Sequence, residues 1–268
     1  MGNVRVDDLE IAYSDLGTSE GLPLVCLTGW CSSRARYDQF LPRAGEGRRV
    51  ISLDWRGHGE SDRPAGDFTV TDLVRDVAAV VETAGLSKFA VASASHSGWA
   101  AIELRRQFGE RIPCLVHMDW LVVEPSQPYM ELIQKLQTDA WMEARDTLFE
   151  IWRGGIDNPA VEAAIDVMNE HGAEMWQRSG REIEGSFQTN GSPLTALAKL
   201  DSQPRVLHLY GQPRDPSYLA SQQAFAADHP WFEVTQVGAR SHFSMIEVPD
   251  EAVAAIDAFL AAESKTSR

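Results

Sequence analysis

The apolar stretch at residues 89–94 constrains the fold most, because it ends abruptly at a polar turn around Ser95 and an amphipathic stretch follows from Gly98. This order predicts a strand, a sharp turn and a helix. A serine at such a tip is held clear of the sheet, near the N–H groups and positive end of the helix. Nucleophile elbows usually read G-x-S-x-G for steric reasons, and here the small residues Ser93 and Ser97 replace both glycines. The alternative interpretation is that Ser95 only caps the helix.

The composition predicts one soluble core with an insertion. The chain has 268 residues, of which 44% are hydrophobic, and no apolar run approaches the roughly 20 residues that span a bilayer. The N-terminus has neither a basic segment nor an apolar segment of the secretory type. Its three cysteines show no disulfide or metal-binding spacing. We therefore expect a cytoplasmic protein with free thiols and no membrane association.

Charge and motif content exclude several classes of partner. A formal net charge of −15 repels polyanions, which argues against nucleic acid. The seven histidines show no H-x-x-x-H or two-histidine, one-carboxylate spacing, so no metal is expected. No G-x-G-x-x-G follows a predicted strand, so no flavin or nicotinamide is expected. No heptad repeat indicates an oligomeric state.

Apolar runs at residues 23–28, 49–53 and 113–118 alternate with helical patterns. This alternation predicts a mostly parallel sheet with helices on both faces and a ligand site beyond the carboxyl ends of the strands. We assign residues 1–120 and 201–268 to this core. Residues 121–200 are helical in pattern and rich in large apolar side chains, so they predict an inserted helical cap. Together the cap aromatics favour a flat, largely apolar ligand.

Three residues stand in the order expected of an α/β-hydrolase fold: Ser95, Asp119 and His242. A carboxylate beside one imidazole nitrogen fixes the tautomer and stabilises the cation that forms when the other nitrogen takes a proton. His242 is therefore the predicted general base. Asp215 competes with Asp119 for the acidic role, since it follows the next strand. After the strand at residues 23–28, Gly29 predicts a sharp turn that brings following N–H groups, such as that of Trp30, toward Ser95 to bind an oxyanion.

The chain resembles the cofactor-independent 3-hydroxy-4(1H)-quinolone 2,4-dioxygenases, from about residue 24 to residue 260. The matching segments are Gly29-Trp30-Cys31, Ser95-His96, residues 118–121, 149–152, 178–181, 190–193 and 229–232, and His242-Phe243. The resemblance implies an α/β-hydrolase fold with an inserted cap. It also implies ring cleavage by dioxygen to an N-acylanthranilate and carbon monoxide, with dioxygen as co-substrate and no metal or organic cofactor. The chain departs from the family pattern beside the serine, at Ala94 and Ser97.

The resemblance also implies roles for individual residues. His242 is the expected base and Asp119 its partner, and Ser95 is expected to hydrogen-bond the substrate. Trp30 and His96 are expected to supply oxyanion-hole amides, and Trp152 to line the cavity. The expected substrate carries a 2-alkyl group, as in an alkyl-quinolone signal molecule, so the reaction would quench that signal. Two alternatives remain open: a serine hydrolase that uses Ser95, His242 and Asp119, and a non-catalytic ligand-binding module.

Overall fold

The computed structural model describes residues 1–266, so the last two residues of the predicted core lie outside the described residues. Eight strands form one sheet in the order β1-β2-β4-β3-β5-β6-β7-β8. Their bounds are β1 Gly2–Val6, β2 Leu9–Gly17, β3 Leu24–Leu27, β4 Arg49–Leu53, β5 Ala90–Ala94, β6 Cys114–Met118, β7 Arg205–Tyr210 and β8 Phe232–Gln236. β1, β2 and β4 pair antiparallel, and every pair from β4 to β8 is parallel. The predicted mostly parallel sheet is confirmed, and β3, β5 and β6 end at the same edge.

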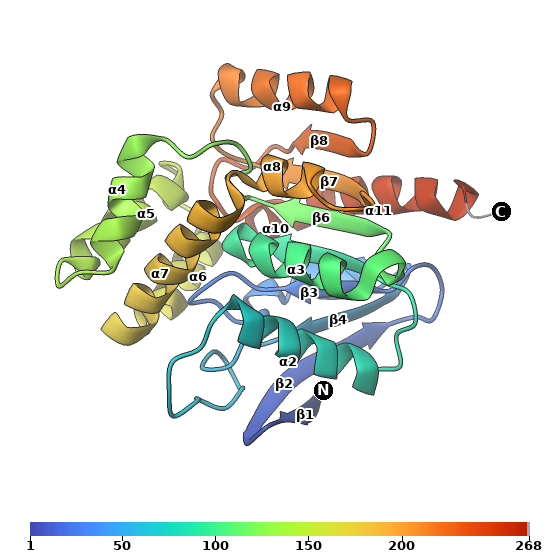
Figure 1. Ribbon diagram of the computed structural model, residues 1–268, viewed down its shortest axis with the longest axis horizontal. Coiled ribbons are helices and arrows are strands. Elements are labelled where there is room, and N and C mark those ends of the chain that lie inside the picture. Colours follow the sequence, from blue (N-terminus) through green and yellow to red (C-terminus); the bar gives the residue numbers. More distant parts are fainter. Residues whose placement is uncertain (267–268) are drawn as a thin grey trace.

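Helices cover both faces of the sheet (Figure 1). Helices α2 and α3 pack together on one face, and α1 and α11 pack together on the other. The core helices are α1 Phe40–Ala44, α2 Val70–Thr83, α3 Gly98–Phe108, α9 Pro216–Asp228, α10 Ser244–Glu247 and α11 Pro249–Thr266. Short 3-10 helices span Arg34–Tyr37, Ser95–Ser97 and Gly109–Arg111.

Between β6 and β7 the chain forms five helices, and the first four of them lie beside the carboxyl edge of the strands (Figure 1). They are α4 Gln127–Leu136, α5 Trp141–Arg153, α6 Pro159–Asn169, α7 Ala173–Asn190 and α8 Pro193–Ala198. α4, α5 and α7 pack on one another. We refer to α4–α8 as the cap helices. Among the described residues, no helix is both long and apolar enough to cross a membrane.

The strands are buried on both faces, which explains their continuous apolar runs. Along β3, Leu24 and Cys26 point to the side of α1 and α11, whereas Val25 and Leu27 point to the side of α2 and α3. This alternation is the two-residue period of a strand. Because both faces of β3 are covered, its carboxyl end is fixed by packing above and below. The loop that follows it therefore starts from a rigid position.

The N-cap of α2 is not one of the residues that the sequence pattern suggests. Thr71 and Asp72 are the polar residues at the beginning of the apolar repeat of α2, but the helix is capped by Thr69. Thr69 and Asp72 form a reciprocal capping box, in which the Asp72 carboxylate accepts the Thr69 backbone N–H at 2.9 Å. The difference arises because Val70 and Thr71 already belong to the first turn.

Candidate active site

Ser95 occupies a strained turn between β5 and α3. Its φ is +52°, a region that L-residues rarely adopt and that nucleophile elbows use to expose the serine. Ser97, which replaces the usual second glycine, turns its hydroxyl inward and donates to the Ala94 carbonyl at 2.7 Å. Gly98 then begins α3 directly against Trp120, where a Cβ would meet the indole at 2.2 Å. The small side chains therefore allow the predicted sharp turn.

His242 lies within hydrogen-bonding distance of this serine. The distance between His242 Nε2 and Ser95 Oγ is 3.1 Å. The imidazole stacks on Trp152 of α5, with ring centroids 5.2 Å apart and an angle of 14° between the planes. Burial lowers the pKa of His242 to about 4. At neutral pH the imidazole is therefore uncharged and able to accept a proton.

The loop that carries His242 is fixed from two sides. The His242 backbone N–H donates to the Trp152 carbonyl at 2.8 Å, which ties the loop to the end of α5. On the other side, the Glu247 carboxylate of α10 accepts the backbone N–H groups of Arg240 and Ser241 at 2.8 to 3.1 Å. The orientation of the imidazole thus depends on both a cap helix and the core.

Asp119 follows β6 with a φ of +49° and is almost fully buried. Its carboxylate accepts the N–H of Gly211 at 2.9 Å, the N–H of Ser244 at 2.8 Å and the Ser244 hydroxyl at 2.5 Å. Burial raises the pKa of Asp119 to about 6, and these hydrogen bonds oppose the rise. No hydrogen bond joins this carboxylate to His242 in the described part of the chain. Asp119 instead holds the backbone two residues beyond His242, and it lines the same cavity.

The competing carboxylate, Asp215, is exposed at the start of α9. It caps that helix by accepting the Ser217 N–H at 2.8 Å, and this hydrogen bond lowers the pKa of the carboxyl group. Asp215 lines neither compartment of the cavity described below. The geometry therefore favours Asp119 over Asp215 as the carboxylate of the site.

The turn after β3 differs in detail from its prediction. Gly29 lies beside Ser95, but the left-handed backbone is at Cys31, whose φ is +58°. The Cys31 N–H donates to His58 Nε2 at 3.0 Å, so the other ring nitrogen, Nδ1, carries the proton and donates to the Arg56 carbonyl at 3.0 Å. His58 is thus buried and neutral, and its hydrogen bond to Cys31 stabilises the left-handed backbone there. A glycine would adopt this conformation without such a contact.

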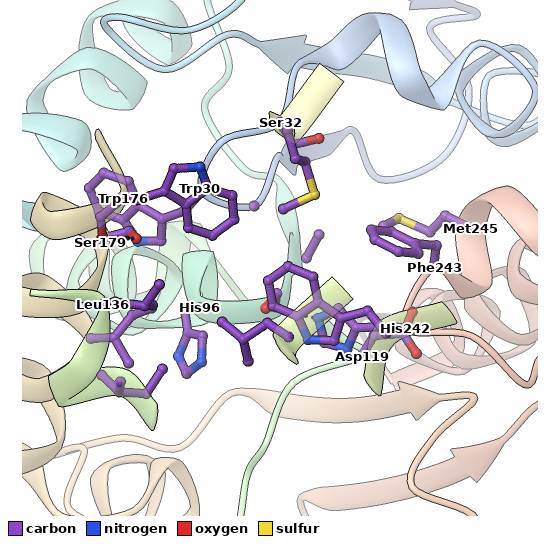
Figure 2. Close-up of a pocket in the computed structure, with 18 of the residues that line it drawn as sticks. Trp30, Ser32, His96, Asp119, Leu136, Trp176, Ser179, His242, Phe243 and Met245 are labelled. Atoms are coloured by element: carbon purple, nitrogen blue, oxygen red, sulfur yellow. Dashed lines mark hydrogen bonds between the residues drawn. The ribbon is translucent and has the colours of Figure 1, made fainter. Parts of the chain in front are cut away.

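These residues surround a largely apolar cavity. Figure 2 shows Trp30, Trp176, His96 and His242 around it. Predicted site residues that line it are Gly29, Trp30, Ser95, His96, Asp119, Trp152 and His242. A second compartment extends toward Leu121 and Gln212, and it shares five lining residues with the first: Ser95, His96, Asp119, Trp152 and His242. The site therefore stands where two compartments meet.

Several residues of the site carry no distinctive motif. Ser244 and Gly211 donate hydrogen bonds to Asp119 from loops that lie far from it in the sequence, so sequence patterns do not show these contacts. Tyr129 of α4 lines both compartments, although the sequence presents it only as one of many cap aromatics. In the region described, no group of three or more His, Cys, Asp and Glu residues is arranged to hold a metal ion.

We expect the protein to lose stability in mild acid, because burial lowers the pKa of five histidines to about 3 or 4. They are His58, His96, His117, His208 and His242. Below about pH 6.5 these histidines are protonated in the unfolded chain but stay neutral in the folded chain. The free energy of unfolding is therefore highest above that pH and decreases as the pH falls below it. Each of these histidines then lowers the free energy of unfolding by about 1.4 kcal/mol per pH unit. The raised pKa of Asp119 has the opposite effect and offsets the contribution of one histidine.

Urea unfolding at pH 7, 6 and 5 measures this loss. His117→Gln serves as the comparison, because it removes one such histidine outside the cavity and should reduce the pH dependence by about one proton. A free energy of unfolding that stays constant between pH 7 and pH 5 would contradict the expectation.

The parallel sheet, the serine elbow after β5 and the histidine loop after β8 together define an α/β hydrolase. Residues 24–256 match the family described as "Alpha/beta hydrolase family". Solved hydrolases share only the fold: an enol-lactonase from Burkholderia xenovorans LB400 superimposes with a TM-score of 0.76 at 18% identity, over 97% of this chain and 100% of that one.

More similar proteins narrow the family. The 2-heptyl-3-hydroxy-4-quinolone dioxygenase AqdC1 of Rhodococcus erythropolis is 32% identical over 96% of this chain and 93% of its own. The 1H-3-hydroxy-4-oxoquinoline 2,4-dioxygenase of Pseudomonas putida is 32% identical over 98% of this chain and 100% of its own. The structure of an AqdC variant in complex with its substrate, the Pseudomonas quinolone signal, matches with a TM-score of 0.93 at 30% identity, over 97% and 99%. The chain belongs to the 3-hydroxy-4-quinolone dioxygenase family.

Proposed function

We propose that this protein is a dioxygenase that opens the heterocyclic ring of 3-hydroxy-4(1H)-quinolones with molecular oxygen, releasing an N-acylanthranilate and carbon monoxide. The observation that carries the proposal is the neutral His242 imidazole, which stands 3.1 Å from Ser95 inside an apolar cavity and stacks on Trp152. A flat heterocycle with an acidic hydroxyl suits such a site, since aromatic walls bind its ring and the imidazole takes its proton. Membership of the family supports the substrate class.

In this proposal His242 Nε2 removes the proton of the 3-hydroxyl group, and Ser95 Oγ hydrogen-bonds the substrate. The buried Asp119 carboxylate favours the imidazolium that results, because both groups line the same low-dielectric cavity. Asp119 also positions the histidine loop through its hydrogen bonds to Ser244. His242 and Ser95 touch the substrate, whereas Asp119 acts through the loop and its charge.

The resulting anion is electron-rich and gives an electron directly to dioxygen, so the proposal requires neither a metal nor an organic cofactor. A peroxide formed at C2 attacks the C4 carbonyl. Backbone amides near Trp30 and His96 stabilise the negative charge on that oxygen, and each such donor contributes about 3 kcal/mol in a dry site. Ring opening then expels C3 with its own oxygen as carbon monoxide. The apolar walls keep out water that would quench the anion or the peroxide.

The test is incubation of the purified protein in air with 3-hydroxy-2-methyl-4(1H)-quinolone and with its 2-heptyl analogue. We expect oxygen uptake and carbon monoxide in equal amounts. We also expect the 2-heptyl substrate to be preferred, because apolar cap residues such as Leu136, Leu148 and Ile183 line the cavity. Oxygen uptake without carbon monoxide would overturn the reaction. Preference for the methyl compound would overturn only the alkyl preference.

A serine hydrolase is the second candidate, because the Ser95 backbone is strained and its hydroxyl meets an imidazole. Ser95→Ala separates the two candidates. We expect ring cleavage to fall only about tenfold, since the substrate loses one hydrogen bond. An acyl-enzyme mechanism would instead lose about 10⁶-fold in kcat. The measurement is kcat for carbon monoxide release, and for hydrolysis of a short-chain ester, by both proteins.

A further inference from the structure

His96 follows the elbow serine and joins the core to the cap helices through its side chain. Its Nδ1 lies 3.2 Å from Trp120 Nε1, and its Nε2 lies 2.6 Å from the hydroxyl oxygen of Tyr129 in α4. The imidazole is buried and packs edge-on against Trp120 and parallel to Tyr129. Both ring nitrogens are therefore engaged.

The chemistry of these partners fixes the position of each proton. An indole N–H can only donate, so His96 Nδ1 must accept from Trp120. A neutral imidazole carries one proton, which must then be on Nε2 and must be donated to the Tyr129 oxygen. Burial, which lowers the pKa of His96 to about 3, keeps the ring neutral. Tyr129 is therefore an acceptor in this contact, and its own hydroxyl proton is not used there.

Tyr129 lines both compartments of the cavity, where they meet at Ser95 and His242. From this arrangement we propose that the Tyr129 hydroxyl donates a hydrogen bond to a negatively charged oxygen of the bound quinolone anion, and so stabilises the deprotonated substrate. The assignment rests on the proposed function, because it concerns the same anion. Trp120 and His96 orient the Tyr129 hydroxyl through Trp120 Nε1 and the two ring nitrogens of His96, and these nitrogens do not contact the substrate.

The neighbouring Tyr218 provides a matched comparison in the second compartment. Its hydroxyl donates to the Trp120 carbonyl at 3.0 Å and accepts the Val122 N–H at 3.3 Å. The Tyr218 hydroxyl proton is thus already used in a hydrogen bond to the backbone. Tyr218→Phe removes a hydroxyl from the same region without removing a donor to the ligand.

The experiment follows the absorption spectrum of 3-hydroxy-2-methyl-4(1H)-quinolone bound to the full-length protein without oxygen, as the pH is varied. The absence of oxygen keeps the ligand intact, and the spectrum reports the pKa of its hydroxyl group. We expect Tyr129→Phe to raise this pKa by about one and to weaken binding of the anion about tenfold, because a hydrogen bond to a charged group is lost. Tyr218→Phe should leave the pKa of the ligand unchanged.

Trp120→Phe gives a second test that keeps Tyr129 in place. Without the indole N–H, the His96 tautomer can reverse and accept the tyrosine proton, so the pKa of the ligand should rise in this variant too. An unchanged pKa in Tyr129→Phe, or an equal rise in Tyr218→Phe, would overturn the proposal. If the wild-type protein binds the quinolone in this assay but releases no carbon monoxide in air, the proposed function fails while the titration still decides the role of Tyr129. If the wild-type protein binds no quinolone, both fail.

Discussion

Replacement of His242 by alanine is expected to lower kcat/KM for 3-hydroxy-4-quinolones about 10³-fold. General-base catalysis contributes about 10² to 10⁴ in rate, and the structure places this imidazole beside Ser95 at the junction of both compartments. Its low pKa, about 4, keeps it unprotonated at neutral pH. The measurement is steady-state carbon monoxide release by both proteins over a range of substrate concentrations.

A spectroscopic control separates lost chemistry from lost binding. In the absence of oxygen, the wild-type protein should convert bound substrate to its anion at neutral pH, whereas His242→Ala should bind it with the hydroxyl proton in place. If the variant still forms the anion and turns over within a few-fold of wild type, another group is the base.

Replacement of Gly154 by alanine is expected to lower the free energy of unfolding substantially. Gly154 ends α5 with a φ of +63°, and a Cβ there would lie 2.0 Å from the carbonyl oxygen of Arg240. That carbonyl belongs to the loop that holds His242, so the added methyl group would push the end of α5 away from it. We expect a loss of about 3 kcal/mol, from left-handed strain of about 1 kcal/mol and overpacking of about 2 kcal/mol.

Gly155 provides the control for that variant. Its φ is +68°, and a Cβ there would meet nothing within 4 Å. Gly155→Ala should therefore cost only the strain, about 1 kcal/mol. We also expect kcat to fall at least tenfold in Gly154→Ala alone, because the hydrogen bond from His242 to Trp152 depends on the same approach. Equal urea midpoints for the two variants would contradict this interpretation.

The sequence predicts most helices because their apolar residues recur periodically, and it predicts the central strands because they are continuously apolar. β3 and β5 read as continuous apolar runs since both faces of the sheet are covered. The positions of Ser95, Asp119 and His242 at one edge follow from the parallel order of the strands. These features depend on local patterns and simple topology, so one sequence suffices to predict them.

Details that depend on contacts between distant loops could not be predicted. The sequence predicts Asp119 as the carboxylate partner of His242, but it does not show that the hydrogen bonds of Asp119 go to Gly211 and Ser244, because these loops converge on it only in space. The strained turn lies at Cys31 instead of Gly29, since His58 supports it from another loop.

Two contacts of the cap helices also could not be predicted from the sequence. Tyr129 is one aromatic residue among many there, and nothing in its sequence neighbourhood shows that its hydroxyl reaches His96. The Gly154-Gly155 pair marks a helix end, yet only the structure shows that the first glycine touches the histidine loop.

In the proposed reaction, dioxygen reacts directly with a substrate anion that His242 generates. The most direct measurement is incubation of metal-stripped, flavin-free protein with a 3-hydroxy-4-quinolone under ¹⁸O₂, followed by mass spectrometry of the product and the gas. We predict that both labelled oxygen atoms enter the N-acylanthranilate while the carbon monoxide carries unlabelled oxygen from the 3-hydroxyl group. Unlabelled product, or turnover that appears only when a metal or flavin is added, would contradict this mechanism.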